Sequence, residues 1–368
     1  MPTTKIAYYF AKPCLFTIIL CYFCSTMKTL VGCTLEELKQ IANALGLPSF
    51  TASQMAKWLY GKKVPSIDEM TNLSKAAREA LKSDGYEVGL NAPLDLQVSK
   101  DGTKKYLFPA GSEGRCIEAV MIPQEDRLTI CVSSQIGCKM GCKFCMTGRQ
   151  GFHGNLTSNE ILNQFLSIDE ADNLTNAVFM GMGEPMDNYD NVMKAIEVLT
   201  SDWGFGWSPK RITVSTVGLI LDLKRYLDES KCHLAVSMHD PIPMQRAELM
   251  PVEKAYSIER VVELVKHYDF TGQRRVSFEY IMFDGLNDDK KHADAIVRLL
   301  RGLECRVNLI RFHQIPDSPL KASSDAAIAH FMERLNSQGI ITTLRASRGQ
   351  DVFAACGLLS GLKNESND

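Results

Sequence analysis

The chain has 368 residues, of which 45% are hydrophobic and 23% charged, as is typical of a soluble globular protein with one large and one smaller domain. Its formal net charge of −2 excludes a uniformly basic surface, so a nucleic acid would have to bind at a local patch. The 12 cysteines are scattered along a long chain, which excludes the class of small secreted proteins held by disulfides.

Residues 1–26 differ from the rest of the chain because they are strongly apolar. Lys12 and Pro13 interrupt this stretch and leave about a dozen apolar residues in a row, whereas a membrane-spanning helix needs roughly 20. A signal peptide, an unprocessed extension and a misassigned start upstream of Met27 remain open, and we favour the last. We therefore expect no association with a membrane.

Residues 27–95 predict a small all-helical accessory domain. Apolar residues recur at helical spacing, and three capping boxes predict helix starts at Thr34, Thr51 and Ser66. The pattern alone does not separate a nucleic-acid-binding module from a domain that only packs.

Residues 96–345 predict an α/β fold in which short apolar runs alternate with amphipathic helices. The runs are 127–133, 176–181, 211–216, 233–238, 275–282, 306–310 and 340–344. Repeated strand–helix units imply a parallel sheet with right-handed crossovers, and about six of them predict a partial (βα)6 barrel. In such folds the chemistry lies at the C-terminal ends of the strands. Residues 346–368 form a tail that carries Cys356.

The sequence "CKMGCKFC" at 138–145 places Cys138, Cys142 and Cys145 in one loop. A structural zinc site would need a fourth ligand, and His153 is a candidate. An iron–sulfur cube usually has four cysteines, so three would leave one iron open to an external ligand. We favour the iron–sulfur cluster, and its thiolates favour a reducing compartment such as the cytoplasm.

The CxxxCxxC spacing, with Phe144 before the last cysteine, resembles the radical S-adenosylmethionine superfamily. The resemblance implies a 4Fe–4S cluster whose open iron chelates S-adenosylmethionine and whose electron cleaves it to a 5′-deoxyadenosyl radical. The stretch "FMGMGEPMDN" at 179–188 agrees with this interpretation. There Gly183 allows a close backbone approach, and Glu184 can pair with the methionyl amine.

Three longer stretches resemble the RlmN/Cfr family of rRNA methyltransferases, and RlmN more closely. They are "SSQIGCKMGCKFCMTGRQGFHGNLT" at 133–157, "SMHD" at 237–240 and "TTLRASRGQDVFAACGLL" at 342–359, within a likeness that spans about residues 28–361. The resemblance implies methylation of C2 of an adenine in the peptidyl-transferase centre of 23S rRNA, and of C2 of an adenine in tRNA. It also implies maturation of rRNA and tRNA as the cellular role.

The same resemblance implies roles for three residues and two molecules of S-adenosylmethionine per turnover. The first would methylate Cys356, and the second would supply the radical that removes a hydrogen from that methyl group. The methylene carbon would then add to the adenine, and Cys131 would release the product by forming a disulfide with Cys356. Glu118, within the strand-like "RCIEAVMIP" at 115–123, matches the family's base, and we expect it to be buried with a raised pKa.

The family's contacts to S-adenosylmethionine carry over by position. They fall on Gly183, Glu184, Ser215, Ser237, Met238, His239 and His313. His313 departs from the family pattern, which has an asparagine there, although histidine can still donate or accept a hydrogen bond.

Residues 131–153 contain Lys139, Lys143 and Arg149 and no acidic residue, which gives a local charge of +3 suited to RNA phosphates. The expected partners are 23S rRNA, tRNA and an unidentified one-electron reductant protein, with the enzyme itself a monomer. Two alternatives remain open at this point. One is a Cfr-type enzyme that methylates C8, and the other is a non-catalytic RNA-binding protein with an iron–sulfur or zinc site.

Overall fold

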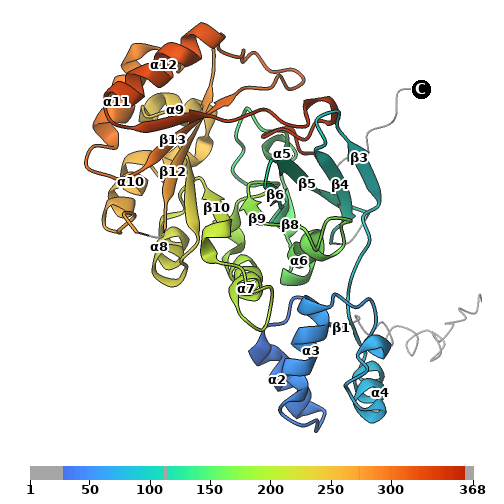
Figure 1. Ribbon diagram of the computed structural model, residues 1–368. Coiled ribbons are helices and arrows are strands. Elements are labelled where there is room, and N and C mark those ends of the chain that lie inside the picture. The colour runs from blue at the N-terminus through green and yellow to red at the C-terminus, as the bar shows by residue number, and fades with distance from the viewer. Residues whose placement is uncertain (1–27, 112–113, 273, 361–368) are drawn as a thin grey trace, which may run out of the picture.

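A ten-stranded mixed sheet forms the centre of the computed structural model, which describes residues 28–111, 114–272 and 274–360 (Figure 1). The strand order is β14-β13-β12-β11-β10-β9-β6-β5-β4-β3. The predictions made for residues 1–26 fall outside the described residues. Within the described part of the chain, no helix has the length and apolar character needed to cross a membrane.

Seven parallel strands make up the larger part of this sheet, in chain order. They are β6 (Arg127–Cys131), β9 (Asn176–Phe179), β10 (Ile212–Thr216), β11 (His233–Ser237), β12 (Val276–Met282), β13 (Arg306–Arg311) and β14 (Ile341–Leu344). All seven predicted strands are confirmed, and the inner ones are largely buried between neighbouring strands and crossover helices, whereas β14 lies at the edge of the sheet and is partly exposed.

Six long helices connect these strands and cover the outside of the sheet (Figure 1). They are α6 (Ser158–Leu166), α7 (Tyr189–Thr200), α8 (Ile220–Glu229), α10 (Ile258–Lys266), α11 (Lys290–Leu299) and α12 (Asp325–Ser337), with the shorter α9 (Pro243–Leu249) before α10. The arrangement confirms the predicted partial (βα)6 barrel. Four short turns of helix lie between these elements, at η3 (Pro185–Asn188), η4 (Pro209–Arg211), η5 (Pro251–Lys254) and η6 (Gln350–Val352).

An antiparallel extension of the sheet was not predicted as such. It consists of β3 (Asp95–Val98), β4 (Lys104–Pro109) and β5 (Cys116–Gln124), which pair in sequence order and join the barrel through β6. A separate pair is formed by β7 (Gln135–Gly137) and β8 (Phe152–Asn155), which enclose the short helix α5 (Met146–Arg149).

The N-terminal region is helical, as predicted. It contains α2 (Leu35–Ala44), α3 (Thr51–Ala56), η1 (Lys57–Gly61), η2 (Ile67–Glu69) and α4 (Lys75–Ser83), bracketed by the paired strands β1 (Lys28–Thr29) and β2 (Tyr86–Glu87). Thr34 forms the predicted capping box with Glu37. A helix starts at Thr51, as predicted, but the expected capping box is absent, because Phe50 is the N-cap and the Thr51 side chain is buried. Ser66 precedes only a short turn of 3-10 helix and makes no capping bond.

Two buried amides on α6 fasten this helical region to the barrel. The Asn159 Nδ2 donates to the carbonyls of Val31 and Gly89 at 3.1 and 2.9 Å, and Asn163 Nδ2 also donates to the Gly89 carbonyl at 2.9 Å. Such bonds satisfy backbone groups that would otherwise be buried without a partner. The accessory region therefore packs against the first crossover helix, while the C-terminal ends of the strands remain available for a site.

Candidate active site

The three clustered cysteines follow β7, so a short strand separates them from β6, whereas the sequence placed them directly after the first strand. Gly137 ends β7 with φ +74°, and a Cβ there would lie 1.9 Å from the Gly151 carbonyl oxygen. Only glycine fits this close approach. The tight packing of β7 against β8 fixes the start of the loop, and Cys145 ends it as the residue that precedes α5.

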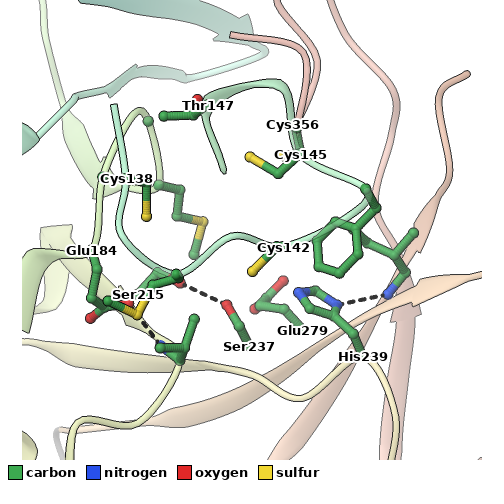
Figure 2. Close-up of a pocket in the computed structure, with 18 of the residues that line it drawn as sticks. Cys138, Cys142, Cys145, Thr147, Glu184, Ser215, Ser237, His239, Glu279 and Cys356 are labelled. Carbon is green, nitrogen blue, oxygen red and sulfur yellow. Dashed lines mark hydrogen bonds between the residues drawn. The ribbon is translucent and has the colours of Figure 1, made fainter. Parts of the chain in front are cut away.

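One cavity, shown in Figure 2, collects most of the predicted site residues at the C-terminal ends of the strands. The predicted residues that line it are Cys138, Cys142, Cys145, Gly183, Glu184, Ser215, Ser237, His239 and Cys356. They come from five separate parts of the sequence. The fold thus brings the cysteine loop, three strand ends and the C-terminal tail to one place.

The cysteine thiols fit a metal centre by their chemistry. Burial raises the pKa of Cys138 to about 12 and also raises that of Cys142, so these thiols need a bound positive centre to be held as thiolates. Among the described residues, no three His, Cys, Asp or Glu side chains are placed so that they could hold one metal ion. His153 is exposed and its Nε2 lies 3.1 Å from the Gln150 carbonyl oxygen. His153 is not among the residues that line the cavity, so the donor set is three thiols, which suits a cluster with one open iron better than a zinc ion that needs four ligands.

Glu184 is fixed at one wall of this cavity, after β9. Its Oε2 accepts a hydrogen bond from the Val217 amide at 2.9 Å, and its Oε1 accepts one from the Met186 amide at 3.1 Å. Burial raises the pKa of this carboxyl group to about 7, although these hydrogen bonds oppose the shift. A cationic amine in the cavity would restore the charged form, which is the property expected of a carboxylate that receives an ammonium group.

Gly183, directly before Glu184, makes a close approach to β7, while the approach to the cosubstrate that the sequence predicts stays a prediction. Its φ is +98°, and a Cβ there would lie 2.5 Å from the Cβ of Gln135 on β7. The Gln135 Oε1 in turn accepts a hydrogen bond from the Glu184 amide at 2.9 Å. The glycine therefore lets the strand end and the cysteine loop meet.

His239 and two serines form the floor of the cavity. The hydroxyl oxygens of Ser215 and Ser237 are 3.5 Å apart, at the ends of the adjacent strands β10 and β11 (Figure 2). The His239 Nδ1 accepts a hydrogen bond from the Ile281 amide at 3.1 Å, and its ring lies edge-on to Phe144, with 4.8 Å between centroids. Burial lowers the pKa of His239 to about 3, so its imidazole is neutral.

Two predicted contacts do not line the cavity. Met238 is fully buried, and its carbonyl oxygen accepts a hydrogen bond from Arg246 Nε at 2.9 Å. His313 follows β13 and is half-buried, and burial lowers its pKa. Their side chains therefore keep the role of ligand contact only as a prediction.

The C-terminal tail is fastened to α5, the helix that follows the third cysteine. The Met146 amide donates to the Gly357 carbonyl at 2.8 Å, and the Thr147 hydroxyl donates to the Leu359 carbonyl at 2.7 Å. The Gln150 amide group donates to the Ser360 carbonyl at 2.6 Å. These bonds hold Cys356 beside the cysteine loop, although more than 200 residues separate them in sequence.

Cys131 and Cys356 lie within electrostatic reach of each other and of Arg345. Burial raises the pKa of Cys131 to about 12, the nearby Cys356 adds to the rise, and Arg345 opposes it. The Cys356 thiol is open to the cavity, yet its protein surroundings raise its pKa, and again Arg345 opposes the rise. The two predicted reacting thiols therefore share one guanidinium group as a charged neighbour.

Glu118 is buried, as predicted, in the middle of β5. Its Oε1 lies 2.9 Å from the Nζ of Lys105 on β4, and its Oε2 accepts a hydrogen bond from the Ser360 amide at 2.6 Å. The side chain does not line the cavity itself. Instead it is joined to the same C-terminal tail that carries Cys356.

Sequence reasoning missed Glu279, a cavity residue on β12. Its carboxylate is almost fully buried, and its Oε2 lies 3.0 Å from Arg345 Nε. The available signal was the single acidic residue in the run "RVSFEYIM" at 275–282, because a buried carboxylate in an apolar strand needs a partner.

The known proteins that this chain resembles agree with the chemistry inferred for this site. Residues 132–296 match the family described as the radical SAM superfamily, and residues 28–86 match the ribosomal RNA large subunit methyltransferase N-terminal domain. The chain is 58% identical over 337 residues to the probable dual-specificity RNA methyltransferase RlmN of Parabacteroides distasonis, which covers 92% of this chain and 98% of that protein. It is 41% identical over 332 residues to the dual-specificity RNA methyltransferase RlmN of Syntrophus aciditrophicus, with coverage of 89% and 95%.

A solved structure agrees with these sequence matches. The crystal structure of a radical SAM methyltransferase from Sphaerobacter thermophilus superimposes with a TM-score of 0.85 at 38% sequence identity, and the match covers 91% of this chain and all of that one. The likeness therefore extends over the helical region, the barrel and the tail together.

Proposed function

Because this chain belongs to the RlmN family of radical S-adenosylmethionine RNA methyltransferases, we propose that it methylates C2 of an adenine in 23S rRNA and C2 of an adenine in tRNA. The observation that carries the proposal is the single cavity lined by Cys138, Cys142, Cys145, Glu184 and Cys356. An enzyme that transfers a methyl group through one of its own cysteines needs that cysteine beside its radical source.

The three loop cysteines would hold the 4Fe–4S cluster that the family implies, and Glu184 would receive the amino group of S-adenosylmethionine. When bound, the cluster supplies the electron that cleaves the carbon–sulfur bond of this cosubstrate. Ser215, in the floor of the cavity, is placed to hydrogen-bond the rest of the molecule. We propose that two molecules of S-adenosylmethionine are used in each turnover.

Cys356 would carry the transferred carbon and Cys131 would release it. The Cys356 sulfur would accept a methyl group in place of its proton, and the methyl carbon would then lose a hydrogen atom to the 5′-deoxyadenosyl radical and bond to the adenine ring. The adduct would give up its unpaired electron, for which the oxidised cluster is the acceptor when bound, and the ring proton would go to Glu118. The Cys131 thiolate would next attack the Cys356 sulfur and form a disulfide, and the electron pair of the broken carbon–sulfur bond would stay on the new carbon, which takes up a proton to become the methyl group. The electrostatic interaction of the two thiols with each other and with Arg345 supports the pairing of Cys131 with Cys356.

Glu118 would take the proton from the ring carbon. In the structure both carboxylate oxygens have partners, Lys105 and the Ser360 amide. To act as the general base, Glu118 would need the tail around Ser360 to shift when RNA binds. This links the acceptance of a proton to the docking of the substrate.

The decisive experiment compares Cys356→Ala and Cys131→Ala with the wild type, on an anaerobically reconstituted enzyme and a fragment of 23S rRNA. We expect the wild type to produce 2-methyladenosine, Cys356→Ala to produce none, and Cys131→Ala to accumulate a covalent protein–RNA adduct. Cys232→Ala is the matched control, since Cys232 is a buried thiol outside the cavity. Normal methylation by Cys356→Ala would disprove the mechanism.

The same digest separates the C2 enzyme from one that methylates C8, since mass spectrometry against standards distinguishes 2-methyladenosine from 8-methyladenosine. C8 stays the second candidate because both reactions would use the three loop cysteines and Cys356, and the cavity that these residues line does not distinguish them. We further propose that the enzyme acts as a monomer in the cytoplasm, where a one-electron reductant protein would serve it.

A further inference from the structure

The cavity contains a buried ion pair to which the mechanism above assigns no chemical role. Glu279 is 2% exposed, and its Oε2 lies 3.0 Å from the Nε of Arg345. Its other oxygen accepts hydrogen bonds from the Ser277 hydroxyl at 2.9 Å and from the Asn308 amide group at 2.8 Å. Ser277 and Asn308 therefore hold one oxygen of the carboxylate in place, and the other oxygen can serve as a rigid anchor for the guanidinium group.

Arg345 is also fixed through its own backbone. It directly follows β14, and its amide donates to the Leu309 carbonyl on β13 at 2.8 Å, which extends the pairing of these two strands. Its Nη1 lies 3.4 Å from the Met180 sulfur, a weak acceptor. Within the described residues, the Nη2 atom has no hydrogen-bond partner. One edge of the guanidinium is thus held by Glu279, and donors remain for a ligand.

The position of this cation constrains where a substrate base can lie. An adenine that receives carbon from Cys356 and is then released by Cys131 must lie close to both thiols. Arg345 lies within electrostatic reach of both of them and lines the cavity together with Cys356. A base at that point therefore also meets the guanidinium group.

Adenine offers this group a suitable acceptor, because ring nitrogens flank each of its C–H carbons. A carbon radical bound to sulfur is electron-rich and adds more readily to a ring whose neighbouring nitrogen accepts a hydrogen bond from a cation. Preorganised donors of this kind stabilise the charge distribution of a transition state without reorganisation. Arginine suits the role because it stays charged and presents several donors in a plane.

We propose that Arg345, anchored by Glu279, is a catalytic residue that donates a hydrogen bond to the ring nitrogen beside the target carbon of adenine and promotes the addition of the Cys356 methylene carbon. The inference rests on the proposed function and adds a residue to it. The step forms one carbon–carbon bond and moves the unpaired electron from the methylene carbon into the ring. No proton, electron or group leaves in this step.

The test measures two half-reactions separately, the methylation of Cys356 and the methylation of the RNA. The variants are Arg345→Gln, Arg345→Lys and Glu279→Gln. Peptide mass spectrometry measures methylation of Cys356, and nuclease digestion measures methylation of the RNA. We expect Arg345→Gln to lower the rate of RNA methylation by about 10²–10³-fold, as for loss of one preorganised donor, while Cys356 methylation stays near the wild-type level. Arg345→Lys should recover part of the rate, and Glu279→Gln should show a smaller loss of the same kind.

A matched control is Arg334→Gln, which breaks an ion pair of the same type with Asp294, 2.7 Å long, between α12 and α11. It should leave both half-reactions unchanged. RNA binding, followed by fluorescence anisotropy, should also be close to wild type for Arg345→Gln, because the proposed bond acts mainly in the addition step.

A substrate analogue provides a measurement that a purely structural role would not affect. RNA with 1-deazaadenosine or 3-deazaadenosine at the target lacks one of the two nitrogens that flank C2. One of these analogues should slow the wild type and have no further effect on Arg345→Gln. The inference is overturned if both half-reactions fall together in the Arg345 and Glu279 variants, or if neither falls. Failure of the proposed function would look different, since the wild type itself would then yield no methyladenosine.

Discussion

Lowering the pH from 7 to 5 should destabilise the metal-free protein through His239. This imidazole is buried, and its Nδ1 accepts a hydrogen bond from the Ile281 amide, so the folded state holds the neutral form. Burial lowers the pKa to about 3 from an ordinary value of 6.5. The unfolded chain therefore binds a proton that the folded chain does not, and stability falls as the pH drops from 6.5 towards 3.

The size of the effect follows from the two pKa values. At 1.36 kcal/mol per pKa unit, the whole window is worth roughly 5 kcal/mol, of which about 2 kcal/mol is lost between pH 7 and pH 5. With an entropy of unfolding of about 2.1 cal/mol/K per residue, this loss lowers the melting temperature by about 3 °C. A protonated imidazole would be unfavourable here because Arg246 would repel it and because it would be buried against the ring of Phe144.

The assay compares wild type and His239→Asn at pH 7 and pH 5 by thermal unfolding of protein prepared without iron. Asparagine suits the position because His239 has a φ of +54°, a conformation that asparagine tolerates. Other groups titrate in both proteins, so the difference between the two pH-dependent changes isolates His239. If the variant loses as much stability as the wild type between pH 7 and pH 5, the imidazole is not held neutral and the reasoning is wrong.

Two further predictions concern the framework of the site. Gly183→Ala should destabilise the protein by several kcal/mol, because the new Cβ would lie 2.5 Å from that of Gln135. Its control is Gly206→Ala, where φ is also positive but no atom lies within 4 Å, so only about 1 kcal/mol of backbone strain is expected in thermal unfolding. Asn159→Ala should cost about 1–3 kcal/mol by leaving the Val31 carbonyl unpaired and removing one of the two hydrogen bonds to the Gly89 carbonyl, and hydrogen exchange in the N-terminal helices should rise. Unchanged exchange there would show that other contacts hold the two regions together.

Local patterns in the sequence were enough for the seven parallel strands and for the cysteine loop. An apolar run between turns predicts a buried strand wherever it lies in the chain, because a parallel strand inside a sheet is buried on both faces. The spacing of Cys138, Cys142 and Cys145 likewise places three thiols in one loop before any folding is considered. The division of the chain at residues 26, 95 and 345 stays a prediction.

Other features depended on partners that no local pattern identifies. No local pattern indicated that β3 and β4 pair in antiparallel order with β5, since alternation of residues along a strand does not select its neighbour. Thr51 carries the residue pattern of a helix cap, yet its burial turned the side chain inward and Phe50 took the position. Here tertiary packing outweighed a local preference of about 1 kcal/mol.

What the sequence by itself determined is the chemistry of each part: three thiols for a cluster, a carboxylate after a glycine, and a reactive cysteine near the end of the chain. What only the tertiary structure decided is that Cys356, Arg345 and Glu279 line one cavity and that Cys131 lies within electrostatic reach of Cys356 and Arg345. These residues are separated by up to 225 positions, as for the pair Cys131 and Cys356. Contacts between residues so far apart in the sequence form only when the strands pair into one sheet and the tail docks onto it. Both events depend on the packing of the whole chain.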